Sequence, residues 1–351
     1  MSLHSILYER IEDNPAGETL EAPSFFIDLN LDQVIDAVTA GRQEYNLKPF
    51  FYAFPRNKNT VLYRQEIARD LEDDTLMDAV KSFSAEMRMM RRYLAMLGEL
   101  HYRYHIEGWF LEAAHVYLDA VFRLAQAVST MELRSRGLSE FRAYLTQHVR
   151  SERFTAFRME TNNLKADLAS IQYCVIINGN RVDVRKYDSE TDYSAEVEAT
   201  FIKFRQGAVK DYRKNLAYRS GMHHVEAAIL DRVARLHPDI FARLDNYFGR
   251  NRDFPDETIR AFDREIQFYV AYLDFTAKLN RARLSFCYPR ISDRSKDVYD
   301  YKGFDIALAN RRVAENSPIV CNDFHLKGPE RIIVVSGPNQ GGKTTFARTF
   351  G

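Results

Sequence analysis

The sequence has few cysteines: Cys174, Cys287 and Cys321 are the only three among 351 residues. They lie far apart, which excludes a disulfide framework and the short cysteine spacing of a zinc site. The N-terminal residues have neither a cationic flank nor an apolar run long enough for a secretory signal peptide. No stretch approaches the roughly 20 consecutive apolar residues that cross a bilayer. We therefore expect a reduced, cytoplasmic protein with no membrane partner.

An excess of charge of one sign is also missing, because 49 Lys and Arg residues balance 49 Asp and Glu residues. A neutral chain is not a globally basic nucleic-acid binder, so any nucleic-acid surface must be local. Apolar residues make up 46% of the chain, which excludes a wholly disordered protein. At roughly 150 residues per domain, the length predicts two or three domains.

Proline and glycine are sparse in several stretches, and there the sequence favours long helices. Residues 59–107 contain no Pro and one Gly, and most of them are good helix formers. In residues 108–133, apolar side chains recur three and four positions apart, as on one face of a helix. Two further helices are predicted to begin near Ser151 and after Pro255. The predicted fold class is mainly α.

One short segment interrupts the helical pattern. Two β-rich runs, 173–177 and 181–187, flank Asn178-Gly179-Asn180. An Asn-Gly pair is typical of a type I′ turn, in which both central residues need positive φ. We predict a small β-hairpin inserted between long helices. The stretch 201–221 that follows is basic, with six Lys or Arg residues and one Asp.

The residues before the C-terminus match the phosphate-binding pattern G-x-x-x-x-G-K-[ST] in full. Small residues allow the backbone to curl, so that successive N–H groups point at phosphates. Lys343 is expected to reach the β- and γ-phosphates of ATP, and the Thr344 hydroxyl to join the Mg²⁺ shell. We expect Ile332–Val335 to form the buried strand before the loop and a helix to begin at Lys343, with its positive end toward the phosphates. The predicted cofactor-binding residues are Gly337, Pro338, Asn339, Gln340, Gly341, Gly342, Lys343, Thr344 and Thr345.

At this loop the chain resembles the MutS family of DNA mismatch-repair ATPases, within the wider ABC-type ATPases. The form G-P-N-x-G-G-K-[ST] is characteristic of that family, and residues 319–326 resemble its nucleotide-edge segment. Upstream, residues 61–67 resemble the opening of the family's helical core, and residues 272–277 resemble the end of its lever. The resemblance covers roughly residues 50–351 and is most specific from residue 319 onward.

The resemblance implies a long-helix core and lever bundle with a β-hairpin clamp, followed by the first strands and P-loop of a truncated α/β ATPase domain. It divides the chain into an N-terminal segment (1–50), a core and lever domain (51–300) with the clamp at about 150–220, and the start of the ATPase domain (301–351). The implied function is that of a DNA mismatch-repair ATPase, or one of related DNA metabolism, that couples ATP binding to a grip on duplex DNA as a homodimer. The DNA phosphates would be contacted by basic residues of the clamp, namely Lys203, Arg205, Lys210, Arg213 and Lys214.

The sequence departs from the family pattern at several points. No Phe-x-Glu motif precedes the core, so mismatch reading is not implied. Ile319 stands where an aromatic residue often stacks on adenine, and Asp305-Ile306 replaces the usual His-Pro. The chain ends soon after Lys343, before the acidic strand that would hold Mg²⁺, so we expect ATP hydrolysis from the full gene product and not from this chain alone.

Other interpretations of the same sequence stay open. The basic stretch is equally typical of a solvent-exposed helix face. The whole chain is also compatible with a helical scaffold, or with a non-repair ABC-type ATPase whose nucleotide site controls dimerisation.

Overall fold

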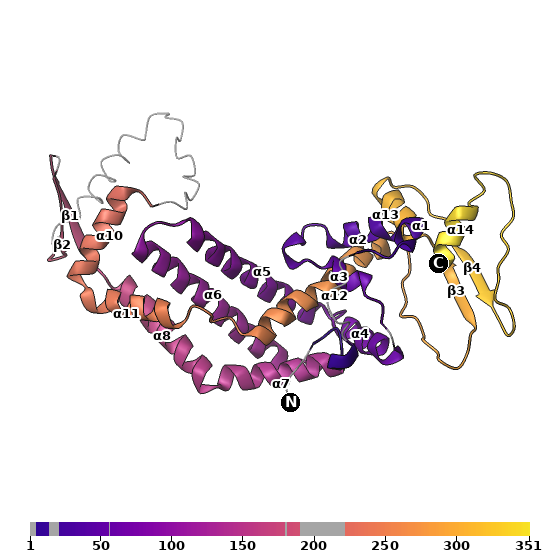
Figure 1. Ribbon diagram of the computed structural model, residues 1–351, viewed down its shortest axis with the longest axis horizontal. Helices are drawn as coiled ribbons and strands as arrows, with labels where there is room; N and C mark the ends of the chain where they lie inside the picture. The colour runs from indigo at the N-terminus through magenta and orange to yellow at the C-terminus, as the bar shows by residue number, and fades with distance from the viewer. Residues whose placement is uncertain (1–4, 14–20, 56, 180, 190–221) are drawn as a thin grey trace, which may run out of the picture. The chain divides into compact units, whose positions relative to one another are not determined.

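A computed structural model describes residues 5–13, 21–55, 57–179, 181–189 and 222–351 (Figure 1). Over these residues the chain is mainly helical, with two small antiparallel β-hairpins, as the predicted fold class requires. The chain folds as two compact units: unit 1 comprises Met1–Ser82, Leu124–Gln147 and Pro255–Gly351, and unit 2 comprises Phe83–Arg123 and His148–Phe254. No helix in the described part of the chain is long and apolar enough to cross a membrane. The domain boundaries near residues 50 and 300 stay predictions.

Most helices and strands belong to one unit alone. Unit 1 contains α1 (Phe25–Leu29), α2 (Leu31–Thr39), α3 (Lys48–Tyr52), α4 (Lys58–Asp70), α12 (Glu257–Arg281), β3 (Val298–Gly303), α13 (Ile306–Ala314), β4 (Asn322–Leu326) and α14 (Lys343–Phe350). Unit 2 contains α8 (Glu152–Ala169), β1 (Tyr173–Asn178), β2 (Arg181–Lys186), α10 (His224–Leu236) and α11 (Pro238–Arg250). Three helices contribute residues to both units: α5 (Asp74–Met96), α6 (Arg103–Ser129) and α7 (Arg136–Arg150). Single 3-10 turns occur at Ile11–Asp13, Gln43–Tyr45 and Leu97–Glu99.

Side-chain caps explain where the long helices begin. The Ser151 hydroxyl accepts a hydrogen bond from the Phe154 N–H at 3.2 Å, which confirms the predicted start of α8. The Asp256 carboxylate accepts from the Ile259 N–H at 3.1 Å at the start of α12, just after Pro255. The stretch 59–107 is helical but not continuous. Asp73 accepts from the Leu76 N–H at 3.0 Å and begins α5 as a helix separate from α4.

The core of unit 1 is formed where α12 meets α2 and α13. Its buried side chains are Val34, Val38, Tyr45, Leu47, Ala271, Phe275, Leu279, Leu284, Ala307 and Ala309. Elsewhere in the unit, the ring of Phe141 on α7 stacks on Phe262 of α12, with ring centroids 3.5 Å apart and planes within 8°. Burial of this apolar surface is the main free energy that holds the helices together.

Unit 2 is held together by aromatic contacts and by ion pairs between neighbouring helices. Tyr247 of α11 stacks on Phe157 of α8 at 5.7 Å between ring centroids. Arg250 forms an ion pair with Glu160 across the same two helices.

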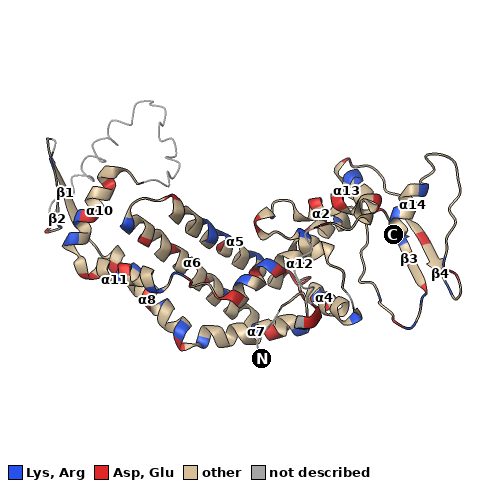
Figure 2. Cartoon of the chain, in the orientation of Figure 1, with Lys and Arg blue, Asp and Glu red and all other residues tan. Residues whose placement is uncertain are grey.

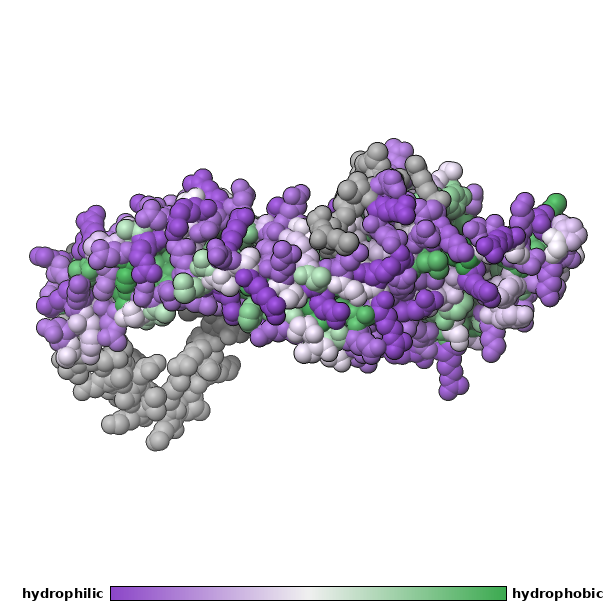
Figure 3. Space-filling model, turned by 90° about the horizontal axis from the view of Figure 1, so that it is seen from below, coloured by the Kyte–Doolittle hydropathy of each residue, from purple (hydrophilic) through white to green (hydrophobic). Residues whose placement is uncertain are grey.

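Lys and Arg residues are interspersed with Asp and Glu residues along the described helices, as expected for a neutral chain (Figure 2). Figure 3 shows a mostly hydrophilic surface with separate apolar patches.

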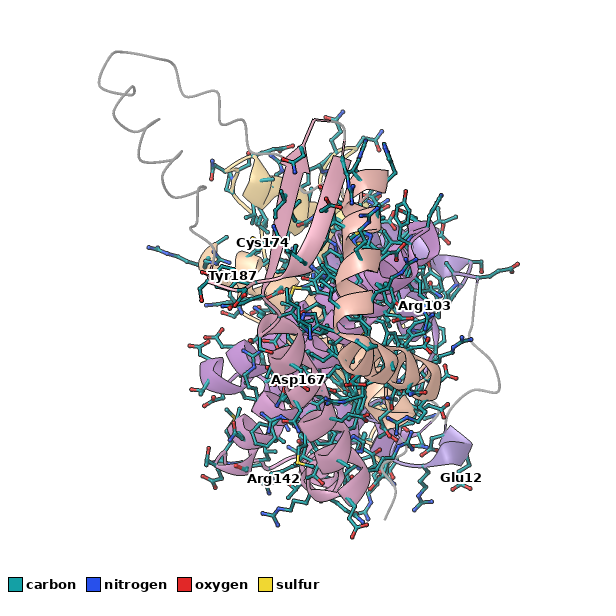
Figure 4. The ribbon with its side chains drawn as sticks, turned by 90° about the vertical axis from the view of Figure 1, so that its left-hand side faces the viewer. Glu12, Arg103, Arg142, Asp167, Cys174 and Tyr187 are labelled. Carbon is teal, nitrogen blue, oxygen red and sulfur yellow. The ribbon has the colours of Figure 1, made fainter. Side chains whose placement is uncertain are left out.

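The predicted hairpin is present in unit 2 as strands β1 and β2. Their antiparallel register runs from the Tyr173–Lys186 pair to the Asn178–Arg181 pair. The last pair of the ladder joins Asn178 to Arg181, so Asn178 ends β1 rather than occupying the centre of the turn, and Gly179 of the turn has φ of +59°. The base of the hairpin, with Cys174 and Tyr187, lies close to the end of α8 that carries Asp167 (Figure 4).

The segment before the phosphate-binding motif differs from the prediction. Ile332–Val335 is not a strand, and Ile332 and Val334 are 82% and 87% exposed rather than buried. A strand needs a neighbour to pair its N–H and C=O groups. Within the described chain, β3 and β4 pair with each other and not with this segment. The prediction of a buried strand here was wrong.

Candidate nucleotide-binding loop

The candidate site is the loop from Gly337 to Gly342 and the first turn of α14, all in unit 1. The Phe324 ring of β4 packs against Phe346 and Phe350 of α14, at 6.1 and 5.1 Å between ring centroids. The Arg348 side chain donates a hydrogen bond to the Asp28 carbonyl at 3.1 Å. Figure 1 shows α14 beside the β3–β4 hairpin. These contacts hold the helix whose N-terminus the loop enters.

The loop forms a tight turn that depends on its glycines. The Gly341 N–H donates to the Pro338 carbonyl at 3.1 Å, and a Cβ on Gly341 would lie 3.0 Å from that oxygen. Gly342 is the N-cap residue of α14 and has φ of +86°, a conformation that L residues other than Gly rarely adopt. The predicted start of a helix at Lys343 is confirmed.

The Lys343 side chain folds back over the loop. Its ammonium donates hydrogen bonds to the carbonyl oxygens of Gly337 and Pro338, at 2.8 and 2.7 Å. A positive charge is therefore held against the first two residues of the loop, on the side chain of the residue that begins α14. This charge and the helix N-terminus both attract an anion.

The residues present fit a phosphate group. The first N–H groups of a helix have no intrahelical partner, and Gly342 has no side chain with which to cap them. Phosphate oxygens would accept from the N–H groups of Lys343, Thr344 and Thr345, and the loop is exposed and open to such a ligand.

A magnesium ion would depend largely on the nucleotide. Thr344 is exposed and offers one hydroxyl oxygen. No group of three or more His, Cys, Asp or Glu side chains suited to a metal occurs among the residues that the structure describes. Mg²⁺ commonly keeps several waters and binds through substrate phosphates with one or two protein oxygens, so Thr344 with a nucleotide is a suitable donor set.

Two residues that depart from the family pattern have structural roles. The Asp305 carboxylate accepts from the Leu308 N–H at 2.9 Å and caps α13. Ile319 is half-buried and packs against the core of unit 1. The Asp305 cap is a local signal, since its partner lies three residues later, whereas the packing of Ile319 depends on distant parts of unit 1.

Comparisons with family models, with curated proteins and with solved structures found no match for this chain. The resemblance to the MutS family therefore rests on the loop and on the segments quoted from the sequence.

The residues predicted to contact DNA belong to a different part of the chain from the loop. Lys203, Arg205, Lys210, Arg213 and Lys214 lie outside the described residues. The neighbouring hairpin is described and carries Arg181, Arg185 and Lys186 on β2. Arg181 pairs with Asp183 at 3.1 Å, so part of this charge is neutralised within the strand.

The contacts that hold α14 were not found from the sequence. Phe324 lies 13 residues before Gly337, and Asp28 lies near the other end of the chain. No local spacing pattern links them to α14.

Proposed function

We propose that this chain is part of a MutS-like DNA-binding ATPase of DNA mismatch repair or related DNA metabolism. The supporting observation is the loop geometry: a tight glycine turn leads into a helix N-terminus that has no side-chain cap, and the Lys343 ammonium is bound to the carbonyl oxygens of the loop. This combination suits the β- and γ-phosphates of a nucleotide better than it suits a neutral ligand.

Different groups of the chain would have different roles at the phosphates. The N–H groups of the first turn of α14 bind and orient the phosphate oxygens, and the Lys343 ammonium leaves the loop carbonyls to neutralise their charge. The Thr344 hydroxyl provides an oxygen for Mg²⁺. When bound, ATP with Mg²⁺ supplies the phosphoryl group that is transferred to water in the full gene product.

Nucleotide binding would act on the rest of unit 1 through α14. Because Phe346 and Phe350 pack on Phe324, a movement of the helix N-terminus is passed to β4. The Arg348 bond to the Asp28 carbonyl links the same helix to α1. We assign the grip on duplex DNA to the clamp, through the predicted basic residues and the β1–β2 hairpin. Two copies joined through their ATPase domains would complete the sites.

The experiment uses the full gene product, a fluorescent ATP analogue and a labelled DNA duplex whose anisotropy is followed. We expect ATP to change the DNA affinity, and Lys343→Ala to lower nucleotide affinity at least tenfold and abolish that change. Arg312→Ala is the matched control, because it removes a positive charge from an exposed position on α13, outside the loop and α14. DNA affinity should also fall steeply between about 50 and 200 mM salt.

The outcomes separate this function from its alternatives. DNA affinity that ignores both nucleotide and salt would reject the proposal. Reversal of Lys210, Arg213 and Lys214 to Glu should abolish DNA binding and leave nucleotide binding intact. A reversal variant and a wild type that both dimerise with nucleotide and both lack DNA binding would instead favour a helical scaffold.

A further inference from the structure

Unit 1 contains a cavity of about 430 Å³, which we call the unit 1 cavity. It is lined by residues from the end of α4, the start of α5, the C-terminal half of α12 and the segment 286–289. Cavities of this volume commonly hold small-molecule ligands. None of the residues of the candidate nucleotide-binding loop lines it, so it is a separate site.

Much of the cavity wall is apolar and aromatic. The rings of Tyr272, Phe286 and Tyr288 line it, together with the side chain of Met77 on α5. Such a wall suits the apolar body of a ligand, and a few polar groups then fix how that body is oriented.

One face of α5 places opposite charges at two positions in this wall. Asp74, Met77 and Lys81 follow one another at three- and four-residue spacing and all line the cavity. Seven residues separate Asp74 from Lys81, which on a helix rising 1.5 Å per residue is roughly 10 Å. The cavity therefore has a carboxylate and an ammonium along one wall, with an apolar side chain between them.

The Lys81 end has an excess of positive charge. The Lys81 ammonium donates to one oxygen of the Asp274 carboxylate at 2.7 Å, and the Arg42 guanidinium donates to the other at 2.6 Å. Two cations thus share one carboxylate. Because an ammonium has three donors, Lys81 can bind a second acceptor without leaving Asp274.

The Asp74 end has an excess of negative charge. Glu72 lies two residues from Asp74 and also lines the cavity, and its carboxylate accepts from the Tyr288 hydroxyl at 2.7 Å. The Arg69 guanidinium lies over the Tyr288 ring, 4.5 Å from its centroid, and is the cation at this end. Neither Glu72 nor Asp74 forms an ion pair with any residue that the structure describes.

We propose that the unit 1 cavity binds a linear zwitterion, with its ammonium at Glu72 and Asp74, its carboxylate at Lys81 and an apolar body between them. Charge complementarity favours this class over a molecule with one charge, which would leave one end of the cavity unmatched. Three extended residues span about 10 Å, so a free tripeptide has the required separation of charges. The proposal does not depend on nucleotide or DNA binding.

The first test titrates the full chain calorimetrically with the tripeptide Ala-Phe-Ala and two matched forms of it. Acetylation removes the ammonium, and amidation removes the carboxylate. We expect saturable binding of the free peptide, and binding at least tenfold weaker for each blocked form. Equal binding of all three forms, or no binding of the free peptide, would overturn the proposal.

A further ligand separates two sources of the same chemistry. The compound 8-aminooctanoate carries both charges at a similar separation but has no peptide bonds. Affinity similar to that of Ala-Phe-Ala would show that the two charges and an apolar body suffice. Affinity at least tenfold lower would identify free peptides as the occupants.

The second test assigns each end of the ligand to its partner. Lys81→Gln should weaken the free peptide at least tenfold and leave the affinity for the amidated peptide unchanged, because only the free form has the carboxylate. Lys278→Gln is the matched control, since Lys278 is an exposed cation of α12 that does not line the cavity. Equal losses for the free and amidated peptides in Lys81→Gln would contradict the assignment.

The third test locates the ligand in the wild-type chain. Cys287 is exposed and lines the cavity, whereas Cys321 is exposed and does not. We expect saturating Ala-Phe-Ala to slow alkylation of Cys287 by iodoacetamide at least fivefold and to leave that of Cys321 unchanged, as quantified by mass spectrometry. Peptide binding with no protection of Cys287 would place the site elsewhere and reject the proposal.

Discussion

Gly137 at the start of α7 leaves room for the phenol of Tyr63 on α4: a methyl group built on Gly137 would lie 2.6 Å from the Tyr63 hydroxyl oxygen. It would also lie 2.7 Å from Cδ1 of Ile67. Both neighbours are buried, so neither can move freely into solvent. We predict that Gly137→Ala destabilises the protein by about 1–3 kcal/mol, the usual cost of overpacking, as measured by urea unfolding.

Gly108→Ala is the matched control for that substitution. Gly108 lies inside α6, and a Cβ added there meets nothing within 4 Å. Alanine is favoured over glycine in a helix by about 0.5–1 kcal/mol, so this variant should be more stable than the wild type. If both variants shift the unfolding midpoint in the same direction, crowding of the added methyl group against Tyr63 does not determine the stability of Gly137→Ala.

Features encoded in neighbouring residues could be predicted from the sequence. The start of α8 follows from Ser151, whose hydroxyl bonds to an N–H three residues later, and the β1–β2 hairpin follows from two β-rich runs on either side of Gly179. The motif around Lys343 likewise predicted the start of α14.

Features that depend on distant partners could not be predicted in this way. An apolar run such as Ile332–Val335 becomes a strand only if another strand pairs with it, and none of the described strands does so. The backbone of the buried Ile6 bonds to Glu265 and Tyr269, which are 259 and 263 residues away. For the candidate site, the motif indicated the loop but not Phe324 and Asp28, which hold α14 in place.

Gly342 has φ of +86° at the point where the loop enters α14. A Cβ in this left-handed region costs about 1–2 kcal/mol. If the strain opposes the phosphate-binding conformation, Gly342→Ala should weaken nucleotide binding by roughly 5–30-fold. Gly41→Ala is the control, because Gly41 has φ of +75° and no atom within 4 Å of an added Cβ but lies outside the loop. It should lose similar stability and keep its nucleotide affinity, as measured by titration with a fluorescent ATP analogue.

Glu107 on α6 gives unit 2 a pH-dependent stability. Burial raises the pKa of its carboxyl above the usual value, although the hydrogen bond from Arg103 Nε, at 2.8 Å, opposes the shift. The folded state therefore holds this proton more tightly than the unfolded state does. The stability from Glu107 is present below its unfolded pKa of about 4.3 and is lost as pH rises through the higher folded pKa.

Glu107→Gln removes this titration and keeps a polar side chain of similar size. We predict that the free energy of unfolding of the wild type falls relative to that of the variant as pH rises from about 4 to 7. Urea unfolding of both proteins at several pH values measures the difference and cancels the titration of other groups. A difference that stays constant over this range would show that Glu107 titrates alike in the folded and unfolded states.

Thr161 of α8 and Tyr247 of α11 form a buried hydrogen bond in unit 2, with 2.6 Å between their hydroxyl oxygens. The Thr161 hydroxyl also lies 2.7 Å from the Phe157 carbonyl, to which it donates its one proton, so Tyr247 must be the donor to Thr161. Tyr247→Phe then leaves no donor unsatisfied and should cost about 0.5–1.5 kcal/mol. Thr161→Val leaves the Tyr247 hydroxyl buried without an acceptor and should cost about 1–3 kcal/mol. The double variant should be no less stable than Thr161→Val alone, because both partners are then apolar. A double-mutant cycle by urea unfolding tests this order, and strictly additive losses would mean that the two hydroxyls do not interact.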